Sequence, residues 1–124
     1  MTHAKLEDLI LDYYNVQADY PFEYDLQTAV FRHTGTGKWF AVAMKISWEK
    51  LGKRDKSKTD IVNFKCSPEI VESLVGEERG IYPAYHMNKA HWLTAALEEC
   101  DVDTVSWLLS ISYDLTKGKM QNKR

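Results

Sequence analysis

The first part of the chain carries apolar residues at helical spacing. They are Leu6, Leu9, Ile10, Tyr13 and Val16, and acidic residues occupy the other side. This period predicts an amphipathic helix from about residue 5 to residue 18, which residues 19–21 are expected to end.

Alternating apolar and polar positions predict strands in the next part of the chain. The segments with this pattern are 28–33, 38–46 and 61–66. Two glycines within residues 34–37 predict a tight hairpin turn between the first two strands. Residues 49–58 are strongly charged, and we expect them to form an exposed hairpin loop between the second and third strands.

A short helix and a further strand follow. Ser67 can cap a helix that starts at Pro68 and ends near Gly76. Residues 80–89 contain a proline and cannot form an interior strand, whereas residues 91–98 alternate like a strand.

The last part of the chain predicts a third helix. Asp101 and Asp103 are suited to cap it. Its apolar face would consist of Val105, Leu108, Leu109, Ser112 and Leu115. We expect Gly118 to close this helix and residues 119–124 to form a basic tail, which leaves residues 1–118 as one domain.

This order of elements predicts an α+β fold in which helices pack on one face of an antiparallel sheet. The face toward the helices is expected to carry Phe40, Val42, Met44, Val62 and Phe64. The opposite face would then present Trp39, Lys45, Asn63, Lys65, Trp92 and Thr94. Interleaved aromatic and lysine side chains on a sheet suit stacking on bases and neutralising phosphates. Coverage of the same face by further strands or by a dimer partner would explain it equally well.

Composition sets the class of protein without naming its function. The chain has 124 residues, 44% of them hydrophobic and 27% charged, which is typical of one globular domain. Its longest apolar run, residues 39–44, is far shorter than the roughly 20 residues that a membrane helix needs. Two cysteines cannot build a disulfide framework, so we expect a protein of the reducing cytoplasm. Separately, we expect the protein to be a monomer.

Charge is distributed unevenly along the chain. The net charge of −2 excludes a generic polycation that coats nucleic acid. Residues 38–66, however, contain eight basic and three acidic residues. The loop 50–58 within this block could reach a phosphate backbone as a basic wing, or it could be an ordinary solvated loop.

Residues 82–92 are dense in hydrogen-bonding side chains: two tyrosines, two histidines, an asparagine, a lysine and a tryptophan. This segment could bind a small molecule or perform acid–base chemistry, or it could be a structural corner. His86 and His91 are poorly spaced for a metal site, and no motif in the chain identifies an enzyme or a cofactor.

Four pieces of sequence resemble the MmcQ/YjbR family of small bacterial proteins. They are GKWFA at 37–41, NFKCSPE at 63–69, YPAYHMNK at 82–89 followed by HW at 91–92, and SYDL at 112–115. The resemblance spans about residues 4–117. It implies a CyaY-like (frataxin-like) fold and DNA binding through a double-wing arrangement.

The resemblance and the predicted sheet face opposite the helices together give a set of candidate residues. The candidates for nucleic-acid binding are Lys38, Trp39, Lys45, Lys65, Lys89 and Trp92. The further positions that match the family motif are Tyr82, Tyr85, His86, Asn88, His91 and Tyr113. A small-molecule or enzymatic site at residues 82–92 and a protein-interaction adaptor remain alternatives to a DNA-binding protein.

Overall fold

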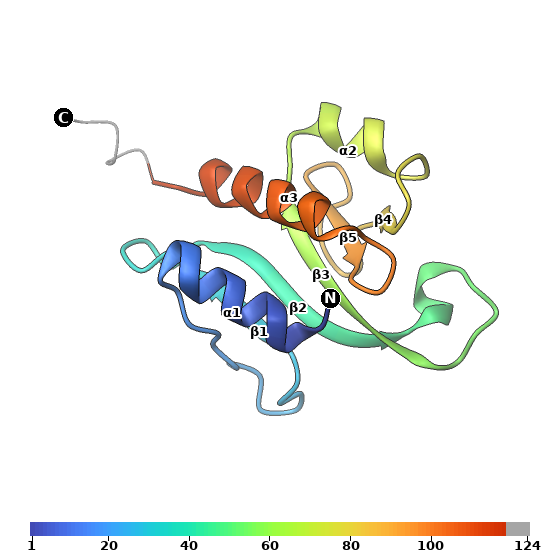
Figure 1. Ribbon diagram of the computed structural model, residues 1–124, viewed down its shortest axis with the longest axis horizontal. Helices are drawn as coiled ribbons and strands as arrows, with labels where there is room; N and C mark the ends of the chain where they lie inside the picture. Colours follow the sequence, from blue (N-terminus) through green and yellow to red (C-terminus); the bar gives the residue numbers. More distant parts are fainter. Residues whose placement is uncertain (119–124) are drawn as a thin grey trace.

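The computed structural model describes residues 1–118, which form an α+β fold of three α-helices and one five-stranded antiparallel sheet (Figure 1). The strands are β1 (Ala29–Arg32), β2 (Trp39–Ser47), β3 (Lys58–Lys65), β4 (Ile81–Pro83) and β5 (Trp92–Ala96). The helices are α1 (His3–Tyr14), α2 (Pro68–Leu74) and α3 (Val102–Leu115), and the 3₁₀ turn η1 (Trp48–Leu51) follows β2. The strand order is β1-β2-β3-β5-β4. The predicted class and order of elements are confirmed, and the tail predicted at residues 119–124 lies outside the described residues.

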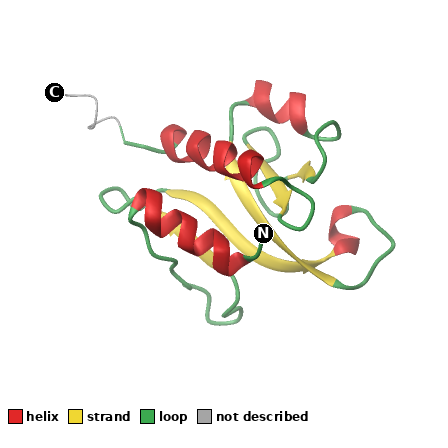
Figure 2. Cartoon of the chain, viewed as in Figure 1, coloured by secondary structure: helices red, strands yellow, loops and turns green. Residues whose placement is uncertain are grey.

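The helices α1 and α3 lie across the same face of the sheet (Figure 2). Leu6 and Ile10 of α1 and Leu108 of α3 are fully buried in one cluster with the aromatic and aliphatic residues of that face. Each fully buried Leu or Ile side chain contributes about 1.5–3 kcal/mol by leaving water. These contacts fix the two helices on one side and leave the other side of the sheet without a helix among the described residues.

A β-bulge between β1 and β2 changes which residues of β2 face the helices. Phe31 pairs with Ala41 and Arg32 pairs with Trp39, so Phe40 has no partner on β1. Such an extra residue lets two neighbouring side chains point to the same side of a sheet. The ring of Phe40 packs against rings from α1 and α3, so both Phe40 and Ala41 belong to the core under the helices.

The prediction of the core face of β2 is therefore wrong beyond the bulge. Val42 and Met44 were expected to face the helices. Ala43 pairs directly with Val62 of the helix-covered core, and directly paired residues of an antiparallel sheet point to the same side. Val42, Met44 and Ile46 consequently lie on the face without helices.

The helix ends differ from the expected ones where a single residue changes the backbone. The first helix ends at Tyr14, four residues early, because Asn15 adopts the left-handed conformation with φ 56°. The start of α2 is as predicted, since the Ser67 side chain accepts a hydrogen bond from the Ile70 N–H. The last helix ends at Leu115, which is exposed and does not share the buried face.

Within residues 1–118, every helix is too short or too polar to traverse a lipid bilayer.

Candidate functional site

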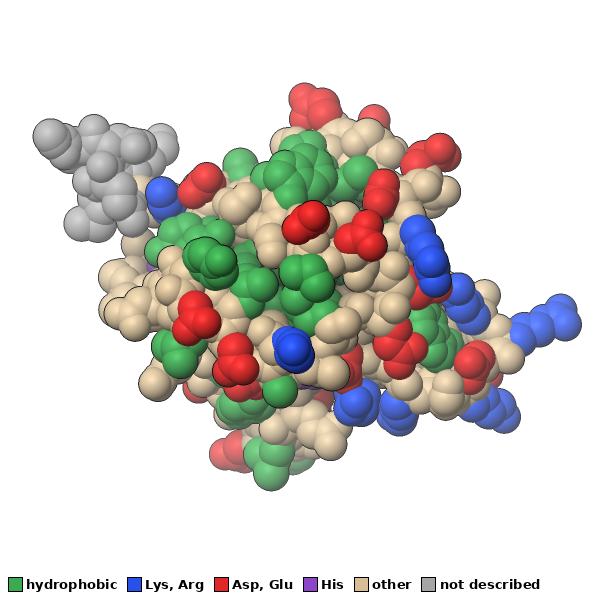
Figure 3. All heavy atoms as spheres, in the orientation of Figure 1, with side chains coloured by type: hydrophobic (Ala, Val, Ile, Leu, Met, Phe, Trp, Pro, Cys, Tyr) green, Lys and Arg blue, Asp and Glu red, His purple; other side chains and the backbone are tan. Residues whose placement is uncertain are grey.

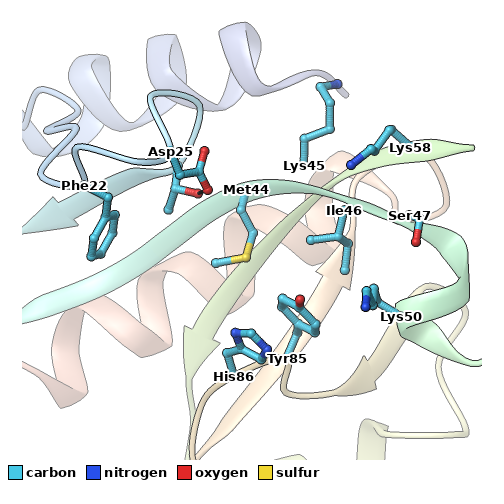
Figure 4. A pocket seen from close by; sticks show the side chains of 11 residues that line it. Phe22, Asp25, Met44, Lys45, Ile46, Ser47, Lys50, Lys58, Tyr85 and His86 are labelled. Atoms are coloured by element: carbon cyan, nitrogen blue, oxygen red, sulfur yellow. Dashed lines mark hydrogen bonds between the residues drawn. The ribbon is translucent and has the colours of Figure 1, made fainter.

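The sheet face opposite α1 and α3 is the candidate site, and we call it the open face. Its residues include Trp39, Val42, Met44, Ile46, Asn63, Lys65, Trp92 and Thr94. Five of the six residues predicted for this face are on it. The sixth, Lys45, is not: its ammonium group pairs with Asp60 at 2.6 Å, and Figure 4 shows its side chain directed toward α1. The bulge accounts for this error, because it reverses the facing of every later residue of β2.

Lys65 and Trp92 are direct partners on the neighbouring strands β3 and β5. Both side chains are half-buried, so each keeps part of its surface in contact with solvent. The same end of the open face carries Trp39, whose ring meets the edge of Phe22 at 6.2 Å between centroids. Lys38 precedes Trp39 and is exposed. Two indole rings and two lysines therefore lie at one end of the face.

A buried hydrogen-bond network crosses the middle of the open face. The Asn63 side-chain amide donates to the backbone carbonyl oxygen of Tyr85 at 3.0 Å, and the Thr94 hydroxyl donates to the Asn63 side-chain oxygen. The Tyr85 N–H donates to the same Thr94 hydroxyl at 2.8 Å. The sequence predicted that Asn63 and Thr94 would be presented to a ligand on this face. Both are fully buried instead, so they are not accessible to a ligand. Their function is to fix the backbone at Tyr85.

The network holds Tyr85 and His86 as a stacked pair. Their rings are 3.9 Å apart at an interplanar angle of 12°. His86 has a φ of 59°, and the other non-glycine residue with positive φ between residues 1 and 118 is Asn15 at a helix end. A left-handed backbone is uncommon for a residue that is neither Gly nor a helix cap, and the buried contacts at Tyr85 maintain it.

A cavity of about 350 Å³ opens on the same face beside this pair (Figure 4). It is lined by Phe22, Asp25 and Thr28 from the loop before β1, by Met44, Lys45, Ile46 and Ser47 of β2, and by Lys50, Lys58, Tyr85 and His86. A second hollow of about 220 Å³ adjoins it and shares Lys50, Tyr85 and His86. We call the two hollows together, which share these three residues, the groove.

The connection between β2 and β3, residues 48–57, forms a basic projection that we call the wing (Figure 1). Lys53 attaches it to β4: its ammonium group lies 5.6 Å from the ring centre of Tyr82 and also 5.2 Å from that of Trp48 within the wing. The same group pairs with Glu99 at 3.3 Å, and the Tyr82 hydroxyl donates to Glu99 at 2.6 Å. The contacts with Tyr82 and Glu99 raise the pKa of Lys53, so the anchor remains charged at neutral pH.

Several motif residues hold the segment 82–92 in place. The Asn88 side chain accepts hydrogen bonds from the N–H groups of Ala90 and His91 at 2.9 and 3.1 Å. The Lys89 ammonium group donates to the carbonyl oxygen of Ala84 at 2.9 Å. These contacts give Asn88 and Lys89 structural roles, which supports the interpretation of this segment as a structural corner.

The motif residue Tyr113 lies apart from the open face. It belongs to α3, on the opposite side of the sheet, and its ring contacts His33 at 4.3 Å and Tyr14 at 4.4 Å. His91, the residue before Trp92, is exposed, and its backbone carbonyl oxygen accepts a hydrogen bond from the Cys66 N–H.

Eight residues that line the cavity were not among the candidate site residues predicted from the sequence. They are Phe22, Asp25, Thr28, Met44, Ile46, Ser47, Lys50 and Lys58. The two lysines belong to the charged run 49–58, whose composition was the available signal. The apolar residues could not be found in this way, since the bulge and the path of the loop before β1 bring them to the groove. No group of three or more His, Cys, Asp or Glu side chains in residues 1–118 is arranged to hold a metal ion.

The fold and this face define a small α+β protein, and comparison with known families gives its class. A family model described as YjbR matches residues 11–115, and the chain therefore belongs to the YjbR family. The resemblance noted in the sequence is thereby confirmed.

Two curated relatives are similar to the chain in sequence. The uncharacterized protein YyaQ of Bacillus subtilis (strain 168) is 38% identical over 118 residues, which is 94% of this chain and 99% of YyaQ. The uncharacterized protein YjbR of Escherichia coli (strain K12) is 38% identical over 53 residues, or 42% of this chain and 45% of that protein.

Solved structures show the same fold. The crystal structure of a Pseudomonas syringae protein has a TM-score of 0.91 at 37% identity, with 94% of this chain and 100% of that chain covered. A Deinococcus radiodurans protein has a TM-score of 0.70 at 24% identity, with 96% of this chain and 80% of that chain covered. This second likeness is one of fold alone.

Proposed function

We propose that the open face binds DNA with little sequence preference, through phosphate contacts from lysines and stacking on aromatic rings. The observation that carries the proposal is the direct pairing of Lys65 with Trp92 on the face without helices. A cation beside an aromatic ring offers one phosphate contact and one base contact within a single nucleotide step.

Charge along the face supports this proposal. Lys50, Lys58 and Lys65 make no ion pair with any residue between 1 and 118, so they are available to phosphates. Lys45, which has Asp60 as its partner, is not part of the proposed interface. Figure 3 shows that acidic side chains are scattered over the helix side, whereas Lys and Arg gather at the wing.

The positions of the two ends of the open face suggest the path that a bound nucleic-acid strand follows. The Trp39, Lys65 and Trp92 end and the wing end lie on either side of the stacked Tyr85–His86 pair. A nucleic-acid strand that follows the face would meet aromatic rings and cations in alternation. Such a surface suits binding without direct reading of base edges.

The proposal concerns a cytoplasmic monomer, and the family resemblance implies that it has a CyaY-like fold with a double wing. Both cysteines are free and buried, which is compatible with a reducing compartment. One copy of the chain supplies all residues of the proposed interface.

Binding to DNA across a series of salt concentrations tests the proposal. We expect the logarithm of the affinity to fall linearly with the logarithm of salt, with a slope of roughly −0.9 per phosphate contacted on duplex DNA. Lys65→Gln should weaken binding and make the slope shallower by about one contact. Lys5→Gln, an exposed lysine of α1 on the other side of the molecule, is the matched control and should change neither quantity. Absence of binding, or an affinity that does not respond to salt, would refute the proposal.

A further inference from the structure

We infer that the cavity at the wing end of the open face receives one unpaired nucleotide, so that the protein prefers single-stranded DNA to duplex DNA. This inference rests on the proposed function and specifies the form of nucleic acid that the same face binds.

The size of the cavity limits what can enter it. Its volume of about 350 Å³ is at the lower end of the range for small-molecule pockets, roughly 300–1,000 Å³. A base that is still paired and stacked in a duplex cannot be inserted into a pocket of this size, but one extruded nucleotide can.

The walls of the cavity suit a planar aromatic ring. Met44 and Ile46 form an apolar surface, and the stacked rings of Tyr85 and His86 stand beside it (Figure 4). Phe22 borders the cavity from the loop before β1. Contacts of a base with aromatic side chains are worth about 1–3 kcal/mol and are nearly independent of the base.

The charges of the cavity favour one orientation of a nucleotide. Lys50 and Lys58 lie on one side of Met44, and Asp25 lies on the other (Figure 4). The hydrogen bond from the Thr28 hydroxyl is the main cause of the lowered pKa of Asp25, which is therefore an ionised acceptor at neutral pH. A phosphate is attracted to the two lysines and repelled by Asp25, whereas the amino group of a base can donate to Asp25.

The wall formed by Tyr85 and His86 is preorganised. Asn63 and Thr94, both fully buried, hold the Tyr85 backbone through its N–H and its carbonyl oxygen. The left-handed backbone at His86 places the imidazole ring against Tyr85 before any ligand arrives. A fixed stacking surface lowers the entropy cost of binding an aromatic group.

Fluorescence anisotropy with a labelled 12-nucleotide strand and its blunt duplex, at the same salt concentration, measures the preference directly. We expect the single strand to bind at least about fivefold more tightly. This matches the stacking contribution of one base, which is about 1–3 kcal/mol.

Two pairs of variants locate the effect in the cavity. Phe22→Ala should reduce single-strand affinity about fivefold or more and change duplex affinity much less. Tyr24→Ala is its control, because Tyr24 is in the same loop, is 99% exposed and does not line the cavity. Lys58→Gln should likewise reduce the single-strand preference, whereas Lys56→Gln, an exposed wing residue outside the cavity, should not. The side chains of Tyr24, Lys56 and Lys58 are exposed, whereas Phe22 is 38% exposed and its ring packs against Trp39. Thermal melts would therefore verify that each variant, Phe22→Ala above all, is folded.

The outcomes distinguish this inference from the proposed function. Salt-dependent binding of equal strength to single strand and duplex would overturn the inference and leave the proposed function intact. A preference for the single strand that is the same in Phe22→Ala and Tyr24→Ala would also overturn it, because the cavity would then not be its source. Failure to bind either form of DNA would refute the proposed function itself.

Discussion

The side-chain amide of Asn63 donates a hydrogen bond to the backbone carbonyl oxygen of Tyr85, 22 residues further along the chain, at 3.0 Å. This contact joins the middle of β3 to the loop after β4 and determines where the stacked Tyr85–His86 pair stands on the open face. It links the stability of the sheet to the shape of the candidate site.

Replacing Asn63 with Leu should reduce the free energy of unfolding by about 1–3 kcal/mol, because the Tyr85 carbonyl and the Thr94 hydroxyl lose buried partners. Asn88→Ala removes an exposed side chain that caps a turn, and its effect should be smaller, about 1 kcal/mol or less. Urea denaturation of the two variants measures the difference. If both variants lost the same free energy of unfolding, the buried network at Asn63 would stabilise the protein no more than the exposed turn at Asn88 does.

Ser112 of α3 connects the last helix to the neighbouring strands β2 and β3. Its hydroxyl donates to the Phe40 carbonyl oxygen at 2.5 Å and accepts from the Lys65 N–H at 2.8 Å. We expect Ser112→Ala to cost about 1–3 kcal/mol of stability, since two buried backbone groups lose their partner. Ser110→Ala on the same helix removes only an exposed hydrogen bond to Trp107 and should stay within about 0.5 kcal/mol of the unmodified protein. The midpoints of denaturant unfolding would provide the comparison.

Gly80 needs both its positive φ of 86° and its lack of a side chain. A Cβ atom at this position would lie 2.7 Å from the Cys100 sulfur and 3.1 Å from the Cys100 backbone nitrogen. Gly52 has a φ of 89°, but a Cβ atom there would meet nothing within 4 Å. Gly52→Ala should therefore cost about 1–2 kcal/mol from backbone strain alone.

Gly80→Ala should cost about 1–3 kcal/mol more than Gly52→Ala, because overpacking adds to the strain. Thermal unfolding of both variants tests this. If the two substitutions were equally destabilising, the close approach of Gly80 to Cys100 would be unimportant.

His33 should make the stability of the protein depend on pH. Burial is the main reason why the pKa of His33 is lowered from its usual value of 6.5, and the nearby Lys117 and Lys38 also act in this direction. Its Nε2 atom carries a hydrogen, because the Tyr113 carbonyl oxygen 3.0 Å away can only accept. Because burial lowers the pKa of His33, folding favours its neutral imidazole over the protonated form, although the hydrogen bond to Tyr113 acts in the opposite direction.

Because the folded pKa lies below the unfolded one, the unfolded chain binds the proton first as the pH falls. Stability from this residue is fully present above pH 6.5 and is lost as the pH falls from there through the folded pKa. Denaturation measured from pH 7.5 to pH 5 should show this loss, and His33→Gln should show a flatter profile in the same window. A profile that is unchanged by the substitution would contradict this assignment.

Much of the fold could be predicted from local sequence. The Ser67–Pro68 start of α2 and the Pro83-limited edge strand follow from the chemistry of single residues and their immediate neighbours. The strands and the α+β class follow from hydrophobic periodicity, which reports burial directly. The pairing of Lys65 with Trp92 on one face was also within reach, because alternation along β3 and β5 continues without interruption.

The composition of the candidate site was decided by tertiary structure. The bulge at Phe40 reverses the facing of β2, which moves Lys45 to the helix side and brings Met44 and Ile46 into the groove. The stacked pair at His86 depends on hydrogen bonds from Asn63, a residue on another strand. Local periodicity cannot register one inserted residue or a contact between distant segments, because both depend on how separate parts of the chain pack together.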